Sequence, residues 1–589
     1  MPRTLFIASL LLLAPPLMCG ASTGADLATL EHRVPELMQA GDVPGVSIAV
    51  IRDGKLFWSG AFGVADPSSG SPTRPDTFFQ AASLSKPVFA YIVLRLADRG
   101  ALGLDTPLIS YLPYERFADE RATRITARMV LSHSTGLPNW GGDKLTLAFA
   151  PGEHFSYSGE GFFYLQKVVE KITGIPLAEL ARREVFAPLG MTRTSYVWLS
   201  PPAAAGVDDY SNVQPTDPDQ KANAAASLLT TATDYSRFLL AVVKGEGLKP
   251  ESVAAMLTPQ INVPSKRTDV LSAPRDDMSW GLGWGLVKTG DGEVFWHWGH
   301  QDAWRAFTAV RRDGRAGLAV FINSATGLSI ARALSDLAGV GGLPVLDWNG
   351  YESYDNPRRQ ARRELLRIFS DQGAAAGLSR FSEMQRAAPG TVDAESVDEL
   401  TDLLIGRGKA AEAAALLVQS AGATPSAKSN GRLGDAWLAA GELERALESY
   451  EAAVKLAPAS PHTDDIRWAR EGLALKKSPV TLSAEALRRF AGDYGSRHVR
   501  LEDGSLTYAR TAAHRSFAWY LPRPTPFSSR AAVTSESNSP SMLPAARPRL
   551  RSSVRQARRA LRRAIHRLRL RPSRRARRSA GRTAPDRPR

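Results

Sequence analysis

Residues 78–87 read Phe-Phe-Gln-Ala-Ala-Ser-Leu-Ser-Lys-Pro and place Ser83 three positions before Lys86. On a helix this spacing puts both side chains on one face, where the amine of Lys86 lies against the hydroxyl and eases removal of its proton. Pro87 is tolerated only in a first helical turn, so a helix is expected to begin close to Ser83, where its N-terminus favours negative charge. About two Ser-x-x-Lys matches arise by chance in a chain this long, so the stretch needs support from elsewhere.

The flanking sequence predicts a sheet built from both ends of one domain. Residues 46–50 alternate as a strand, Asp53-Gly54 forms a hairpin turn, and residues 56–62 return as a second strand. Roughly 200 residues with helical periodicity follow. Strand patterns then return at residues 280–287, 294–298, 306–310 and 317–322. We therefore expect an α+β fold, an antiparallel sheet flanked by helices with an inserted all-helical subdomain.

Further motifs follow Ser83 in a fixed order: VLSHSTGLP at residues 130–138, PGEHFSYSG at 151–159, PLGM at 188–191 and GLGWG at 281–285. This order resembles the serine β-lactamase and penicillin-binding-protein-like family, in its class C and esterase branch, over about residues 30–343. The resemblance implies a β-lactamase/transpeptidase-like fold. That fold agrees with the pattern of strands and helices.

The resemblance also implies catalytic roles. Ser83 becomes the acylated nucleophile, Lys86 its activating partner, and Tyr157 the general acid/base of the family's Tyr-x-Asn element. A phenol has a pKa near ~10, so it becomes a useful base only when a cation lowers that value. We therefore expect Lys86 to lower the pKa of Tyr157.

The third family element, Lys-Thr-Gly, has two candidates. Residues 288–290 spell it literally, but they run into Asp291-Gly292, a hairpin turn that places Lys288 at the tip. Residues 297–299 read His-Trp-Gly on the following strand, and the esterase branch often has His there. We assign this element to His297, with Trp298 and Gly299 as substrate-binding neighbours. The family oxyanion hole is then formed by the backbone N–H groups of Ser83 and His300.

Two departures from the family pattern bear on the substrate. Gly159 stands where the family has Asn, so the amide that binds an acylamido group is missing, and Glu160 beside it adds an acid. His297 replaces Lys, and a neutral His offers no fixed charge to a substrate carboxylate. Both changes favour esters or amides over β-lactams. Three tryptophans are candidates for an acyl pocket, with ordinary packing as the alternative for each: Trp140, Trp298 and Trp304.

Metal chemistry is not expected at this site. His297 and His300 are three apart on a strand and face opposite sides, and no His-Glu-x-x-His spacing exists in the chain. We expect no cofactor.

The function expected is an exported serine hydrolase that forms a Ser83 acyl-enzyme with an ester or amide: an esterase, a β-lactamase-like enzyme, or a D-amino-acid peptidase or amidase. Its partner would be a small acyl substrate or a peptidoglycan-like peptide. The alternative is a catalytically weak cell-wall ligand sensor or scaffold that uses C-terminal helices to bind a protein.

The N-terminus is typical of a signal peptide. Arg3 precedes an apolar run at residues 5–14, which is too short to span a bilayer, and small residues follow. We place the signal peptide at residues 1–25 and the protein in the periplasm or outside the cell. A lipoprotein modified at Cys19, the single cysteine, is the less favoured reading, and no later run predicts a membrane span.

The remaining chain divides into four parts: the hydrolase domain at residues 26–345, a helical region at 346–480, a small β-rich appendage at 481–515 and an Arg-rich tail at 516–589. Residues 400–425 and 433–458 carry small and large residues at tetratricopeptide spacing, 33 residues apart. A generic Ala-rich helical hairpin is the alternative.

The net charge of +15 comes from the end of the chain. Residues 511–589 hold 21 Arg, no Lys and two acids, a net +19, whereas residues 1–510 carry −4. The folded part therefore lacks the basic surface that nucleic-acid binding requires, and no nucleic-acid partner is expected. A frameshift near residues 516–519 competes with a disordered basic tail as the origin of this segment.

Overall fold

The computed structural model describes residues 24–422, 425–458, 462–477, 492–493, 497–502, 505–510 and 515–519. The predicted signal peptide, up to residue 23, and the Arg-rich tail after Trp519 lie outside the described residues. Export and the frameshift therefore stay predictions.

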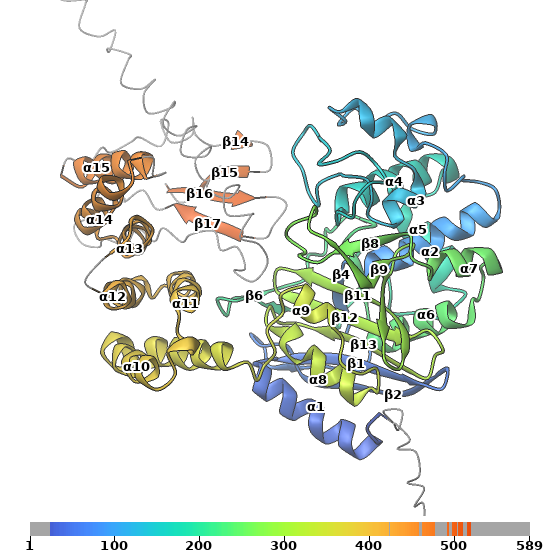
Figure 1. Ribbon diagram of the computed structural model, residues 1–589, viewed down its shortest axis with the longest axis horizontal. Coiled ribbons are helices and arrows are strands. Elements are labelled where there is room, and N and C mark those ends of the chain that lie inside the picture. The colour runs from blue at the N-terminus through green and yellow to red at the C-terminus, as the bar shows by residue number, and fades with distance from the viewer. Residues whose placement is uncertain are drawn as a thin grey trace, which may run out of the picture.

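An antiparallel sheet of nine strands forms the centre of the larger domain, among the residues that the structure describes (Figure 1). Its strands in spatial order are β3 (Ser71–Pro72), β2 (Lys55–Asp66), β1 (Gly45–Arg52), β13 (Ala316–Ile322), β12 (Trp304–Arg311), β11 (Gly292–Gln301), β10 (Gly285–Thr289), β9 (Pro274–Trp280) and β8 (Ile261–Pro264).

The two ends of the domain meet in the middle of this sheet. β1 pairs with β13, so that Val46 lies opposite Ile322 and Arg52 opposite Ala316. The β1–β2 hairpin turns at Asp53 and Gly54, both with positive φ. The predicted sheet, closed by segments from both ends with helices inserted between them, is confirmed.

Side chains alternate between the two faces of the sheet, and both faces are buried in the central strands β1, β12 and β13, whereas β2 is largely exposed or half-buried. In β1, Ala49 and Ile51 join the core beneath the inserted helices, whereas Ile48 and Val50 join the core on the opposite face. The opposite core is covered by three helices, α1 (Leu27–Gly41), α8 (Ala331–Leu337) and α9 (Val345–Trp348). Burial on both sides explains why β13 is a continuous apolar run.

The inserted region between β4 and β8 is mainly helical. Two small two-stranded sheets complete it, β4 (Phe79–Ala82) with β7 (Leu228–Thr230) and β5 (Gly206–Val207) with β6 (Val213–Gln214). Its α-helices are α2 (Ser85–Asp98), α3 (Ala127–Leu131), α4 (Gly159–Thr173), α5 (Leu177–Ala181), α6 (Ala232–Lys244) and α7 (Pro250–Met256).

One predicted strand is wrong. Residues 280–287 were expected to form a single strand, but β9 ends at Trp280 and β10 begins at Gly285. Gly283 adopts a φ of +89° in the turn between them, and a Cβ there would lie 2.4 Å from the Cβ of Ala90 in α2. Glycine thus permits both the turn and the close approach of the helix.

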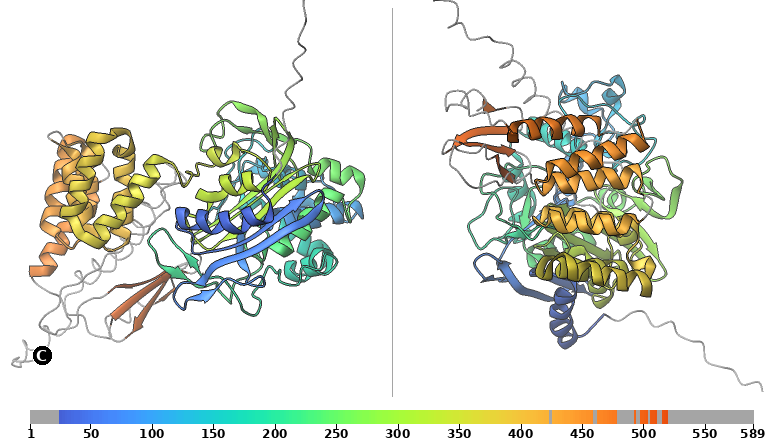
Figure 2. Two further views of the ribbon diagram at one scale, coloured as in Figure 1. Left: turned by 90° about the horizontal axis from the view of Figure 1, so that it is seen from below. Right: turned by 90° about the vertical axis from the view of Figure 1, so that its left-hand side faces the viewer.

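The C-terminal region is a stack of helices beside the domain (Figure 2). They are α10 (Pro357–Ala387), which contains a non-helical break at Gly373, α11 (Ala394–Gly406), α12 (Ala410–Ala421), α13 (Ala427–Ala439), α14 (Leu443–Leu456) and α15 (Thr463–Lys477). In the α13–α14 pair, Gly434 faces the ring of Tyr450, with 2.5 Å between that ring and a Cβ built on the glycine. Such small-against-large packing is what the predicted repeats require, but the tetratricopeptide assignment stays a prediction.

Arginines at the start of α10 anchor this stack to the domain. Arg363 forms an ion pair with Asp42, and Arg359 donates to the carbonyl of Gly41 at 3.2 Å. A separate four-stranded antiparallel sheet, within the predicted appendage and just beyond it, contains β14 (Gly492–Asp493), β15 (Arg497–Glu502), β16 (Ser505–Arg510) and β17 (Arg515–Trp519). Among the described helices, none combines the length and apolarity that crossing a membrane requires.

Candidate active site

Ser83 lies in the turn where the chain passes from β4 into α2. The helix begins at Ser85, two residues later than the sequence suggests, and the carbonyl of Ser83 accepts from the N–H of Lys86 at 3.0 Å. Ser85 fixes this turn because its hydroxyl donates to the carbonyl of Ala82 at 2.6 Å and accepts from the N–H of Leu228 at 2.9 Å. The position of Ser83 is therefore set by hydrogen bonds to both β4 and β7.

Lys86 is buried against Ser83. Its Nζ donates to Ser83 Oγ at 3.1 Å and to the carbonyl of Ala225 at 2.7 Å. Burial holds the pKa of Lys86 well below its usual range. An amine in this state is neutral at a lower pH than an exposed lysine, and a neutral amine accepts a proton from a neighbouring hydroxyl.

Tyr157 lies beside this pair, immediately before the cap of α4. Its ring centroid is 4.8 Å from the Nζ of Lys86 and 4.8 Å from the ring of Trp298. The hydroxyl is buried and has no hydrogen bond of good geometry to any described residue. The predicted trio of Ser83, Lys86 and Tyr157 therefore comes together in space.

The expected effect of Lys86 on Tyr157 is wrong. Burial raises the pKa of Tyr157 above its usual value, and the nearby Ser83 hydroxyl and the charge of Arg267 offset only part of that rise. Burial disfavours the charged form of both groups, so the amine loses its proton more readily and the phenol less readily. The site thus favours a neutral lysine beside a neutral tyrosine.

His297 lies on β11 in the same buried cluster. Its Nδ1 is 2.8 Å from the carbonyl of Trp298, an oxygen that can only accept, so Nδ1 carries the proton and Nε2 has a free lone pair. Burial, together with the charge of Lys86, lowers the pKa of His297 to about 3. The ring centroid is 6.1 Å from that of Tyr157, and Nε2 has no partner among the described residues. His297 therefore adds a neutral acceptor.

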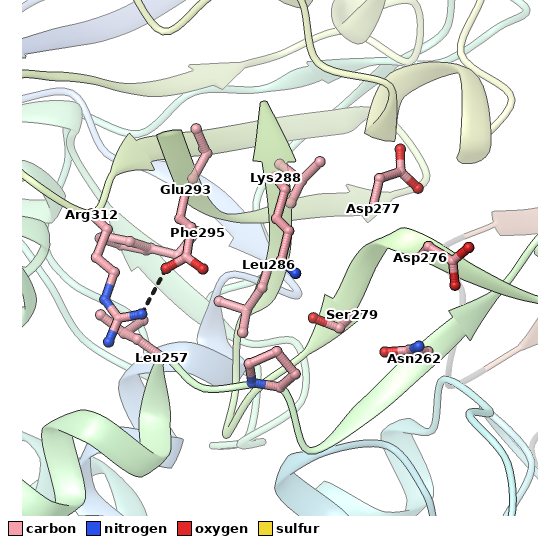
Figure 3. A pocket seen from close by; sticks show the side chains of 13 residues that line it. Leu257, Asn262, Asp276, Asp277, Ser279, Leu286, Lys288, Glu293, Phe295 and Arg312 are labelled. Carbon is pink, nitrogen blue, oxygen red and sulfur yellow. Dashed lines mark hydrogen bonds and ion pairs between the residues drawn. The ribbon is translucent and has the colours of Figure 1, made fainter. Parts of the chain in front are cut away.

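Lys288, the literal candidate, lies elsewhere. It is exposed near the end of the β10–β11 hairpin, where it pairs in register with Glu293. Figure 3 shows its side chain lining a separate pocket that also contains Asp277 and the ion pair of Glu293 with Arg312 at 2.7 Å. The structure thus brings His297, rather than Lys288, to Lys86 and Tyr157.

Gly299 allows β11 to approach the strand that precedes Ser83. A Cβ at Gly299 would lie 2.3 Å from the carbonyl oxygen of Ala81, so any larger residue would push the two backbones apart. This approach brings the backbone at His300 close to the end of β4. The His300 side chain points away from His297, and its Nδ1 is 3.0 Å from the Tyr351 hydroxyl.

Comparison with known proteins identifies the family of the domain that contains this site. Residues 30–340, more than half of the chain, match the family described as Beta-lactamase. The chain belongs to the beta-lactamase family. Esterase EstB from Burkholderia gladioli is 35% identical over 189 residues, which are 27% of this chain and 48% of that protein. Penicillin-binding protein 4* from Bacillus subtilis (strain 168) is 26% identical over 171 residues, 25% of this chain and 37% of that protein.

The chain thus matches less than half the length of these two curated relatives. Among solved structures, the octameric penicillin-binding protein homologue from Pyrococcus abyssi aligns with a TM-score of 0.47 at 23% identity. That alignment covers 58% of this chain and 81% of the other.

Gly159, where the beta-lactamase family has Asn, is covered by Trp140. A Cβ on Gly159 would lie 2.7 Å from the indole ring, so the ring takes the space of the missing side chain. Trp140 is otherwise 47% exposed. Glu160 is not a free acid, because Arg116 binds it at 2.7 Å and the N–H of Gly141 donates to it at 3.0 Å.

The other two tryptophans are buried. Trp298 is packed against Tyr157, as described above. Trp304 lies in the interior against Gly206, and its Nε1 donates to the carbonyl of Ala204 at 3.3 Å. Trp304 is therefore an interior packing residue and does not line an acyl pocket.

Sequence reasoning missed residues from two distant segments that surround this site. Arg267 lies with its guanidinium carbon 5.1 Å from the ring of Trp298 and 6.0 Å from that of Trp348. Trp348 and Tyr351 follow the expected domain end at residue 345, yet both pack on the sheet core. A cluster of three aromatics at residues 348–354 was the available signal.

One group of potential metal ligands occurs among the described residues, far from Ser83 in the fold. Ligand atoms of Asp435, His462 and Asp465 lie within 4.8 Å of one another, at α13 and α15. All three already have partners, since Tyr450 donates to Asp435 at 2.9 Å and His462 Nδ1 is 3.1 Å from Asp465. This group has no part in the site at Ser83.

Proposed function

We propose that the protein is an exported serine hydrolase that cleaves carboxylic esters through an acyl-enzyme on Ser83. The observation that carries the proposal is the buried amine of Lys86, 3.1 Å from Ser83 Oγ, with its pKa held well below the usual range. A nucleophile with an activated base in hydrogen-bond contact is the arrangement that covalent acyl transfer needs.

In the acylation step, Ser83 Oγ bonds to the acyl carbon while its proton passes to the Nζ of Lys86. The developing oxyanion accepts hydrogen bonds from the N–H groups of Ser83 and His300. The ester C–O bond then breaks, and the leaving oxygen takes the phenolic proton of Tyr157, whose raised pKa keeps it protonated. The Lys86 ammonium returns a proton to Tyr157.

In the deacylation step, water adds to the acyl carbon and loses a proton to Lys86. The acyl–Oγ bond breaks, Ser83 regains its proton, and the carboxylic acid leaves. The neutral His297 offers an acceptor to substrate or water, but no positive charge for a substrate carboxylate.

Esters with an apolar acyl group fit the site best. Trp140 stands where an amide would bind an acylamido group, and Arg116 neutralises Glu160. The relative named as an esterase supports this choice, although it is matched over only part of its length. We further propose export, from residues 1–25, and a protein partner for the helices α11–α14.

A hydrolysis panel tests the function. Purified protein is assayed with short-chain and aromatic acyl esters, nitrocefin and D-amino-acid amides, with Ser83→Ala as the control. We expect ester turnover that disappears in Ser83→Ala and exceeds turnover of the other two classes. Equal ester turnover by Ser83→Ala would overturn the proposal, and binding without turnover would favour the sensor or scaffold.

A further inference from the structure

His133 follows α3 and lies directly beneath Tyr157. It is 1% exposed and adopts a φ of +56°, a left-handed conformation that few residues other than glycine, asparagine, aspartate and histidine adopt readily. The site proposed above gives this residue no role. Its contacts, however, converge on one catalytic candidate.

His133 accepts two hydrogen bonds from the backbone, one from the residue before Tyr157 and one from the residue after it; these two bonds are called the bracket. The carbonyl of His133 accepts from the N–H of Ser156 at 2.7 Å, and its Nδ1 accepts from the N–H of Ser158 at 3.1 Å. A single residue therefore holds the backbone on both sides of Tyr157. Because Nδ1 accepts, the imidazole proton lies on Nε2.

The imidazole of His133 also stacks against the ring of Tyr157. The ring centroids of His133 and Tyr157 are 4.2 Å apart, and the ring planes make an angle of 29°. Trp298 packs against Tyr157 at 4.8 Å as well. Since the Tyr157 hydroxyl has no hydrogen bond of good geometry to a described residue, backbone and ring contacts do most to set its direction.

We propose that His133 is a positioning residue that aims the Tyr157 hydroxyl at the leaving oxygen of the ester while Ser83 becomes acylated. The inference rests on the proposed function, in which Tyr157 donates that proton. Displacement of a proton donor by about 1 Å costs roughly 10²-fold in rate, so loss of the bracket has a measurable effect on kcat.

Two substitutions separate the Nδ1 hydrogen bond and the ring contact from the backbone conformation, and both keep the carbonyl that accepts from Ser156. His133→Gly and His133→Asn both tolerate the positive φ, but only asparagine has a side-chain oxygen in place of Nδ1 to accept from Ser158. We expect kcat of His133→Gly to fall roughly 100-fold and kcat of His133→Asn to stay within about tenfold of the parent, both with little change in KM. If thermal melting shows His133→Gly to be unfolded, His133→Ala replaces it; it has no acceptor, and its left-handed conformation costs only about 1–2 kcal/mol.

The leaving group distinguishes positioning from general damage. An alkyl alcohol needs a proton to depart, whereas p-nitrophenolate does not, so His133→Gly should lose far more activity with alkyl esters than with p-nitrophenyl esters. Adding this substitution to Tyr157→Phe should cause little further loss. Equal losses with both esters, or additive losses in the double variant, would overturn the inference. If Tyr157→Phe itself keeps full activity while Ser83→Ala is inactive, the role of Tyr157 fails and the Ser83 acyl-enzyme stands.

Discussion

His297 and Lys288 are nine residues apart on paired strands, yet their environments are opposite. His297 is buried beside Lys86 and Tyr157, with its pKa lowered to about 3, whereas Lys288 is exposed beside Glu293. Residues 288–290 match the family's third motif literally, but they lie at the end of the β10–β11 hairpin, away from Lys86 and Tyr157. Placement in the fold, rather than the literal match to the motif, decides which residue lies beside Tyr157 and Lys86.

The largest contrast is expected between two lysines. Lys86→Met removes the proposed base, and we expect kcat/KM for esters to fall about 10³-fold, within the range seen for general acid–base groups. Lys288→Met is the matched control and should stay within about twofold, since an exposed residue outside the site makes little difference. Steady-state ester hydrolysis measures both. A large loss in Lys288→Met would reassign the third element.

An exchange of residue types should separate the two positions by stability. His297→Lys places a second amine in the buried cluster beside Lys86, which should cost about 3 kcal/mol because that amine must either lose its proton or stay charged without a partner. Lys288→His changes an exposed residue and should cost less than about 0.5 kcal/mol. Denaturant unfolding followed by fluorescence gives both values, and equal stabilities would show that His297 is not buried.

Much of this contrast was predictable from sequence. The β1–β2 hairpin, the later strands and the spacing of Ser83 and Lys86 depend on local patterns, so the fold and the Ser83–Lys86 pair could be predicted from them. Tyr157 was added by the order of the family motifs. The direction in which the pKa of Tyr157 shifts could not be predicted in this way, because it depends on how many distant side chains exclude water from the phenol. Trp348 and Tyr351 were placed outside the domain, since only long-range packing returns them to the sheet core.

Acyl preference should change more modestly. Trp140→Ala opens the space beside Gly159, and we expect kcat/KM for aromatic acyl esters to fall about tenfold, the value of one aromatic contact, with acetyl esters little affected. Trp304→Phe is the control, because Trp304 packs in the interior and should leave the preference unchanged. Equal losses for both ester classes in Trp140→Ala would remove Trp140 from the acyl pocket.

The smallest effect concerns pH. The lowered pKa of Lys86 predicts that kcat/KM rises with pH as the ammonium loses its proton, at a pH below that of an exposed lysine. His297 is neutral throughout the range from about pH 5 to pH 8, because its folded pKa of about 3 lies below that range. His297→Gln should therefore leave the position of the rise unchanged. A shift in this variant would mean that His297 titrates in the active enzyme.

The most direct test traps the acyl-enzyme. The protein is quenched in acid during turnover of a slow aromatic ester, and intact mass followed by peptide mapping locates the added acyl group. We expect one acyl group on the peptide that contains Ser83, present in Lys288→Met and absent in Ser83→Ala. An adduct on another residue, or ester turnover with no adduct in a burst-phase experiment, would contradict a Ser83 acyl-enzyme.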